Sequence, residues 1–321
     1  MRTFRKLLLA LCWLPVLATA ADYPAAPVKL VHAYPGGLVD AGSRALAEQL
    51  GARWKQPVVV EGKPGANELL ASDTVAKAPA DGHTLLVASE TVLANNLYLY
   101  AKLPFDPVQD LVPVTELFQI RFGLVVRGDL PANTLADFVG LMKKEGARHS
   151  YASAGPGSPL HLAMESFRRS AGGFPITHVP YKTIAQVAQD LLGGRVDAIF
   201  ISVPFATPFL ASGKLKILAV TGKGRLAAAP TVPTFAELGY PEVDYSTSIG
   251  LLAPRGTPPE TIARLGADVR EVLRSDEFSK RFLAPNGLEA IASEPQQYAA
   301  TLAARRASTQ RLIKALDIKL E

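Results

Sequence analysis

Residues suited to holding an anion stand in three loops, each between a predicted strand and a predicted helix. The loops are Tyr34-Pro35-Gly36-Gly37-Leu38-Val39-Asp40, Ser89-Glu90-Thr91 and Ser153-Ala154-Gly155-Pro156-Gly157-Ser158. Glycines let a backbone approach a ligand closely, and the free N–H groups of a helix start attract anions. Each loop alone is compatible with an ordinary turn and cap, but three in one chain favour an anion-binding cleft.

We expect the ligand to contact small and polar residues at the carboxyl ends of strands, where parallel sheets bind ligands. Asp40 is expected to cap a helix and shape its loop rather than touch the ligand. Ser158 precedes Pro159, the pattern of an N-cap followed by proline at the first helical position. The predicted ligand-binding residues are Tyr34, Gly36, Gly37, Val39, Asp40, Ser89, Glu90, Ser153, Ala154, Gly157, Ser158 and Ser202.

Patterns typical of enzymes and metal sites are missing from the sequence. It contains no GxxxxGK[ST], HExxH, GxSxG or CxxC. The segment Gly155–Pro159 only loosely resembles a nucleophile elbow, because its serine is displaced and no general base is evident. The histidines are His32, His83, His149, His161 and His178, and they lack metal-ligand spacing. We therefore expect no enzyme, no metal and no cofactor, and we expect the histidines to be structural.

The first twenty residues have the pattern of a signal peptide. Arg2, Arg5 and Lys6 precede an apolar run from Leu7 to Leu17, and Ala18-Thr19-Ala20 is a small-x-small cleavage site. This run is much shorter than the ~20 residues that span a bilayer. The sequence therefore predicts residues 1–20 to be a signal peptide that exports the chain.

Removal of the signal peptide changes the charge and the cysteine count. It takes away three basic residues and no acidic ones, so the formal net charge falls from +5 to +2. No basic face with interleaved aromatic residues remains, so we expect no nucleic-acid partner. The single cysteine, Cys12, also leaves with the signal peptide, which suits an oxidising compartment. No other segment is apolar for long enough to cross a membrane.

The remaining chain alternates strand and helix patterns, as α/β proteins with parallel sheets do. The predicted strands cover 28–33, 58–61, 84–88, 122–126, 150–153, 176–180, 196–201, 216–221 and 249–253. The predicted helices cover 41–54, 67–77, 135–145, 159–170 and 185–192, with two more starting at capping boxes 257–260 and 293–296, the last ending near 316.

A chain of 321 residues suggests about two domains. We expect the chain to cross between two lobes near Phe122–Val126 and again near Ser248–Ala253, a hinge arrangement whose cleft can close on a small molecule. The predicted lobe 1 is discontinuous and comprises residues 22–124 with 247–321, and lobe 2 comprises residues 125–246.

The predicted mature chain resembles the Bug-type substrate-binding proteins of tripartite tricarboxylate transporters, from about Tyr23 to the C-terminus. Each matching segment is short, but their number and order make the resemblance specific. The matching segments are Tyr23-Pro24, Pro35-Gly36-Gly37 with Asp40 and Arg44, 56–61, 64–66, 80–86, 103–107, 151–153, 155–163, 178–182, 213–216, 219–221 and 250–258.

The resemblance implies a type II periplasmic binding protein, with two α/β lobes joined by two crossing strands and a ligand cleft between them. It implies capture of a small organic carboxylate through backbone amides, hydroxyls and bridging waters, and its delivery to membrane transporter subunits. It also implies a periplasmic protein, which we expect to be a monomer. Two alternatives stay open: a ligand-presenting partner of a membrane sensor kinase, and a periplasmic enzyme on the same fold.

Several residues depart from the family pattern and bear on the ligand. Leu38-Val39 stand where the family usually has Pro-Thr, and Asn67-Glu68-Leu69 where it has Gly-Gly-Asn. The loss of hydroxyls and the presence of Leu38, Val39 and Ile201 suggest a more apolar or larger ligand than a simple dicarboxylate. The identity of the ligand stays open.

Three charged side chains carry open alternatives. We expect Glu68 to favour the first turn of its helix through the helix dipole. The alternative places it near the cleft, where it would repel a carboxylate or favour an amino group, and Glu90 raises the same question. Arg121 is expected to be a solvated surface residue, the alternative being a counter-charge beside the hinge.

Overall fold

The structure, a computed structural model, describes residues 23–316. The predicted signal peptide lies outside the described residues. The strands are β1 Val28–His32, β2 Val58–Gly62, β3 Thr84–Ser89, β4 Leu111–Arg127, β5 Ser150–Ser153, β6 Thr177–Pro180, β7 Ala198–Ser202, β8 Leu215–Val220 and β9 Ser246–Pro254. The helices are α1 Leu38–Trp54, α2 Leu69–Ala76, α3 Asn96–Leu99, α4 Leu135–Glu145, α5 Pro159–Ser170, α6 Ile184–Leu192, α7 Val203–Leu210, α8 Pro259–Leu273, α9 Asp276–Phe278 and α10 Pro295–Leu316.

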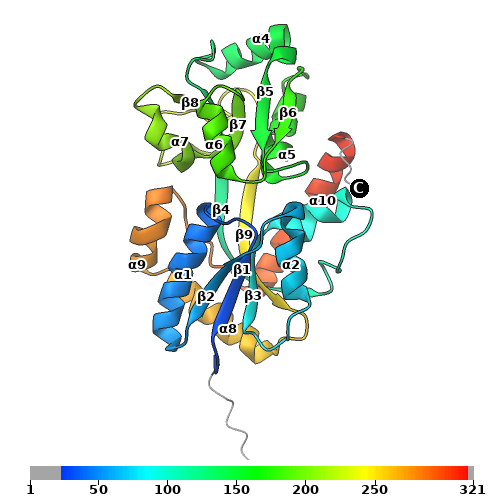
Figure 1. Ribbon diagram of the computed structural model, residues 1–321, viewed down its shortest axis with the longest axis vertical. Helices are drawn as coiled ribbons and strands as arrows, with labels where there is room; N and C mark the ends of the chain where they lie inside the picture. Colours follow the sequence, from blue (N-terminus) through cyan, green and yellow to red (C-terminus); the bar gives the residue numbers. More distant parts are fainter. Residues whose placement is uncertain (1–22, 317–321) are drawn as a thin grey trace, which may run out of the picture.

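The strands form two groups that share β4, and Figure 1 shows the two groups as an upper and a lower lobe. The lower group has the order β2-β1-β3-β9-β4, and in the upper group β4 continues into β7-β5-β6 and also pairs with β8. Up to Arg121, β4 pairs with β9, whereas from Phe122 onwards it pairs with β7. Because β4 changes its partner at this point, we propose that the two lobes are divided at the boundaries predicted above.

The parallel strands of both lobes end at the surface where the lobes meet. In the lower lobe β1 is parallel to β2 and β3, and in the upper lobe β5 is parallel to β6 and β7. Figure 1 shows β1 running up toward the upper lobe and β5 running down toward the lower one. The loops that follow these strands therefore face one another, which is where ligands bind in open α/β sheets.

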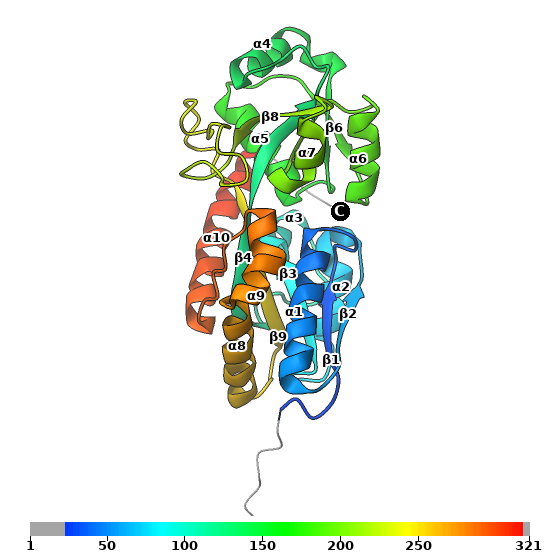
Figure 2. The ribbon, with the colours of Figure 1, turned by 90° about the vertical axis from the view of Figure 1, so that its left-hand side faces the viewer.

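Helix α10 contacts both lobes. It packs along the lower sheet and reaches the upper lobe at its far end, as Figure 2 shows. There the guanidinium of Arg169 in α5 donates to the carbonyl of Ala315 at 2.9 Å, and Ile313 joins Leu99 and Leu162 in a small apolar cluster. The two lobes are thus held together by packing as well as by the crossing strands.

The sequence predicts most of the elements within one or two residues, with clear exceptions. Strand β4 begins at Leu111, whereas the predicted strand begins at Phe122. The first half was missed because its polar side chains break the apolar run. Helix α7, which contains Pro208, was not predicted. Both predicted capping boxes are wrong: Thr257 Oγ1 donates to the carbonyl of Pro254, and Ser293 Oγ accepts from the N–H of Glu116.

Among residues 23–316, no helix combines the length and the apolar composition needed to span a membrane.

Candidate functional site

The loop after β5 contacts the lower lobe directly. The side-chain amide of Asn67 donates to the carbonyl of Pro156 at 2.8 Å, and that of Asn95 lies 3.5 Å from the carbonyl of Gly157. Gly157 also lies against Leu99, which is 2% exposed. The predicted loop that follows β5 therefore lies at an interface with the segments that follow β2 and β3 in the lower lobe.

The first predicted loop is shaped by Asp40. Its carboxylate accepts from the N–H of Gly36 at 3.1 Å and from Arg44 Nε at 3.2 Å, and it lies 2.9 Å from His32 Nε2. His32 Nδ1 accepts from the N–H of Tyr34, so the neutral ring carries its proton on Nε2 and donates to Asp40. Burial lowers the pKa of His32, which keeps the ring neutral.

Asp40 holds its loop in a way that differs from the predicted one. Helix α1 begins at Leu38 with Gly37 as N-cap, so Asp40 lies in the first turn and is not the cap. Burial opposes ionisation of this carboxyl, but hydrogen bonds from Arg44 and Gly36 lower its pKa. Asp40 therefore carries charge, and it fixes the backbone that leads into α1.

Glu68 links the first loop to the second. Its carboxylate accepts from the hydroxyl of Tyr34 at 2.5 Å, from the N–H of Ser89 at 3.0 Å and from the hydroxyl of Ser89. The side chain is 4% exposed, and burial raises its pKa to about 7. The preferred prediction for Glu68 was therefore incomplete: the residue precedes α2, but its carboxylate turns toward the ends of β1 and β3.

Glu90 is a buried residue of the second loop. Its Oε2 accepts from the N–H of Ser248 at 2.6 Å, and the hydroxyl of Ser248 donates to Glu116 at 2.6 Å. Glu90 Oε1 has no hydrogen-bond partner among the described residues. Burial raises the pKa of Glu90 to about 7. The Glu90 carboxyl therefore gains or loses its proton near neutral pH.

We expect Glu90→Gln to flatten the pH dependence of stability. The folded pKa of Glu90 lies above its unfolded value of 4.5, so the folded state holds a proton between about pH 4.5 and 7 that the unfolded state has lost. Its contribution to stability is therefore full below pH 4.5 and lost as the pH rises to 7. Urea unfolding measures the free energy of unfolding at pH 5.0 and at pH 7.5. Its decrease between these two pH values should be about 2–3 kcal/mol smaller in Glu90→Gln than in the unaltered protein. Glu289→Gln, at an exposed position, is the control. If the free energy of unfolding changes equally with pH in Glu90→Gln and in the unaltered protein, the expectation is contradicted.

The third loop is held by two stacked histidines. The rings of His161 and His178 stack with centroids 4.2 Å apart. His161 Nδ1 accepts from the N–H of Gly157 at 2.8 Å, and His178 Nε2 is hydrogen-bonded to Ser153 Oγ at 2.6 Å. Burial lowers the pKa of both rings, to about 4 for His161. These histidines are neutral supports of the loop, and no group of metal-binding side chains occurs among residues 23–316.

Ser158 is the N-cap of α5, and its hydroxyl accepts from the N–H of His161 at 3.4 Å. Val39, Ser89, Glu90 and Ser153 are buried.

Other predicted residues stand apart from the hydrogen-bonded core of the site. Ala154 is half-buried in the third loop, and Ser202 is half-buried at the start of α7, with no side-chain hydrogen bond to the other loops. Arg121 is half-buried and donates to the carbonyls of Thr221 and Gly224, so the expectation of a solvated surface residue was wrong. Its guanidinium ties β4 to the loop after β8.

Sequence reasoning missed Asn67, Asn95 and Leu99 as contacts between the lobes. Asn67 follows β2 through the Pro64-Gly65-Ala66 turn, so the rule used for the other three loops could have found it. Asn95 and Leu99 carry no such signal, because they lie beyond the loop, in a helical segment whose apolar residues are ordinary core residues.

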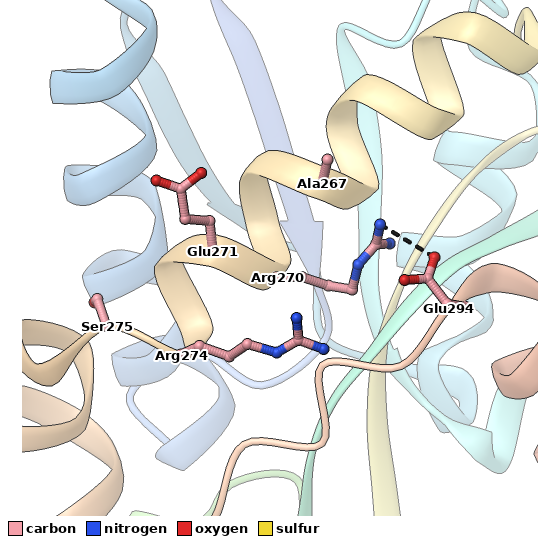
Figure 3. Close-up of a pocket in the computed structure, with 6 residues that line it drawn as sticks. All are labelled: Ala267, Arg270, Glu271, Arg274, Ser275 and Glu294. Carbon is pink, nitrogen blue, oxygen red and sulfur yellow. Dashed lines mark ion pairs between the residues drawn. The ribbon is translucent and has the colours of Figure 1, made fainter.

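A surface hollow lies elsewhere, on the outer side of α8. Figure 3 shows Arg270, Arg274 and Glu271 around it, with an ion pair of 3.1 Å between Arg270 and Glu294. None of the residues predicted to bind the ligand lines this hollow. It is therefore distinct from the interface between the lobes.

Two α/β lobes with facing loops and a shared strand define a solute-binding protein of the periplasmic type, and solved structures agree. An R. palustris protein determined with adipate has a TM-score of 0.87 and 31% identity, covering 93% of this chain and 99% of that one. MatC from Rhodopseudomonas palustris with bound malate has a TM-score of 0.83 and 28% identity, covering 91% of this chain and all of that one.

The sequence comparisons identify the family. Residues 43–318 match the tripartite tricarboxylate transporter family receptor, TctC, and the chain belongs to this family. It is also similar to Protein BugT of Bordetella pertussis, with 35% identity over 280 residues that cover 87% of this chain and 86% of BugT. These matches confirm the predicted resemblance and fold class. The family and its structural neighbours are substrate-binding proteins rather than enzymes.

Proposed function

We propose that this protein is a periplasmic receptor that captures a small organic carboxylate between its lobes and delivers it to a membrane transporter. The observation that carries the proposal is the meeting of the loop after β5 with the segments after β2 and β3, where Asn67 of one lobe is hydrogen-bonded to Pro156 of the other at 2.8 Å. A contact of this kind forms only when the lobes are together, so it can couple ligand capture to closure.

The neighbours with adipate and malate support a carboxylate as the class of ligand. Helices α1 and α5 start at the interface, and the first N–H groups of a helix have no partner within the helix. A micromolar ligand needs about −8 kcal/mol of binding free energy. Charge-assisted hydrogen bonds contribute about 1.5–3 kcal/mol each, so a few oriented donors suffice.

The proposed set of ligand-binding residues is the predicted one, with Asn67 added. Within it, Ala154 offers backbone groups, whereas Gly36 and Gly37, whose N–H groups donate to Asp40 and to the carbonyl of Tyr34, shape the first loop, and the buried members hold the loops in place. In this proposal the receptor acts as a monomer.

A thermal-shift screen of aliphatic monocarboxylates, dicarboxylates, aromatic carboxylates and amino acids tests this proposal. Stabilisation by a carboxylate but not by the matching amide or alcohol is the expected result. If no carboxylate raises the Tm, carboxylate capture is rejected. Capture of transporter subunits from solubilised membranes, with and without the ligand, then tests delivery, and retention of a sensor kinase instead would favour the alternative.

A further inference from the structure

A carboxylate of the chain itself fills a cluster of three hydrogen-bond donors beside the interface. The donors are the hydroxyl of Tyr34, which follows β1, and the hydroxyl and N–H of Ser89, which ends β3. All three donate to the carboxylate of Glu68. Two strands thus aim their terminal donors at one point, and an anion from a third loop occupies it.

This cluster lies directly beside the contact between the lobes. Glu68 follows Asn67, whose amide donates to the carbonyl of Pro156 at 2.8 Å. Asn67 is in turn held by Asn96, whose side-chain amide donates to its carbonyl at 2.9 Å. Glu68 is therefore the neighbour in sequence of Asn67, the residue that contacts the upper lobe.

The surroundings of Glu68 are acidic. Tyr34, Ser89 and Thr91 are the residues whose side chains hydrogen-bond to its carboxylate, and no lysine or arginine forms an ion pair with it among residues 23–316. Glu90 is close enough that the charge of Glu68 adds to the rise in its pKa. A ligand carboxylate brought to this end of the interface would find these donors already taken, and the charged forms of two buried acidic groups would repel it.

We propose that Glu68 takes the place of a ligand carboxylate, so that the protein selects monocarboxylates over dicarboxylates of the same chain length. This inference rests on the proposed function and specifies its ligand. A dicarboxylate needs a donor cluster for each end, and here the chain has already filled one.

The backbone of Glu68 makes a clean test possible. Its φ is +70°, in the left-handed region that favours glycine. The variant Glu68→Gly therefore keeps the loop conformation while it removes the carboxylate and frees Tyr34 and Ser89. Ala66→Gly, at a φ of +47° in the same turn, adds a glycine without removing a charge and is the matched control. Glu68→Gln keeps the shape but not the charge.

The first experiment supplies acetate to the emptied cluster. We expect saturating acetate to raise the Tm of Glu68→Gly by about 2–5 °C relative to sodium chloride at equal ionic strength. Acetamide should not do so, and the unaltered protein, Ala66→Gly and Glu68→Gln should not respond. Absence of an acetate response in Glu68→Gly would overturn the inference.

The second experiment is calorimetric titration with hexanoate and adipate, which share a chain length. The unaltered protein is expected to bind hexanoate at least tenfold more tightly than adipate, and Glu68→Gly to reverse this preference. Tighter binding of adipate by the unaltered protein would also overturn the inference. If the unaltered protein binds no carboxylate in either assay, the proposed function and the selectivity fall together. An acetate response of Glu68→Gly would then still uphold the filling of the cluster by Glu68.

Discussion

Gly157→Ala is expected to weaken ligand binding by about 30-fold. A Cβ at position 157 would lie 2.3 Å from Leu99 Cδ1 and 2.8 Å from Cδ2, closer than real contacts allow. Leu99 is buried in the cluster with Leu162 and Ile313, so it cannot turn away freely. The added methyl group therefore pushes the lobes apart. A cost of about 2 kcal/mol to the closed state corresponds to this loss of affinity.

Calorimetric titration with the carboxylate found in the screen measures this effect. Gly157 has a φ of +73°, so alanine also strains the backbone there. Gly173→Ala separates the two effects, because Gly173 has a φ of +81° but no atom within 4 Å of its added Cβ. It should lose a similar amount of stability and keep its affinity. Partial recovery of affinity in Leu99→Ala/Gly157→Ala would locate the clash, and unchanged affinity in Gly157→Ala would contradict closure at this contact.

Gly250→Ala is expected to lower the free energy of unfolding by about 3 kcal/mol. Gly250 lies in β9, paired with Ala88 on one side and Glu116 on the other. An added Cβ would lie 2.2 Å from the hydroxyl oxygen of Tyr298 and 2.3 Å from its Cζ. Tyr298 is fully buried in the first turn of α10, so the helix has to shift. Overpacking of this kind typically costs 1–3 kcal/mol or slightly more.

Urea unfolding measures the loss, with Gly140→Ala as the matched control. Gly140 lies in α4 with open space around its Cβ, so alanine there should stabilise the helix by about 1 kcal/mol. Tyr298→Val makes room for the methyl group, so its effect and that of Gly250→Ala should be less than additive in the double variant. Strict additivity would show that the two residues do not compete for space.

Much of the fold follows from local pattern. Apolar runs such as Leu85–Ala88 predict buried strands, and Thr134 and Ser158 predict helix starts that the structure confirms. The first half of β4 was missed because Glu116 breaks its apolar pattern. Two side chains donate to that buried carboxylate, and the shorter hydrogen bond comes from Ser248, more than 100 residues further along the chain. Buried polar residues of this kind need partners that local pattern does not show.

The site was predictable to the level of loops but not of side-chain roles. The rule that ligands bind at the carboxyl ends of parallel strands leads directly to the loops that meet between the lobes. It does not reveal that Ser89 and Tyr34 donate to the carboxylate of Glu68. That arrangement depends on a left-handed turn and on two strands that are distant in the sequence. The role of Asp40 was only partly foreseen, since it shapes its loop from inside the helix.

The continuity of β4 sets how the two halves of the molecule can move. One unbroken strand of 17 residues carries backbone hydrogen bonds to β9 below Arg121 and to β7 above Phe122. A strand that belongs to a sheet at each of its ends bends and twists as an elastic strip, whereas a loose tether would let the halves swivel freely. Any movement of one half against the other would bend this strand, which restricts the directions that such a movement can take.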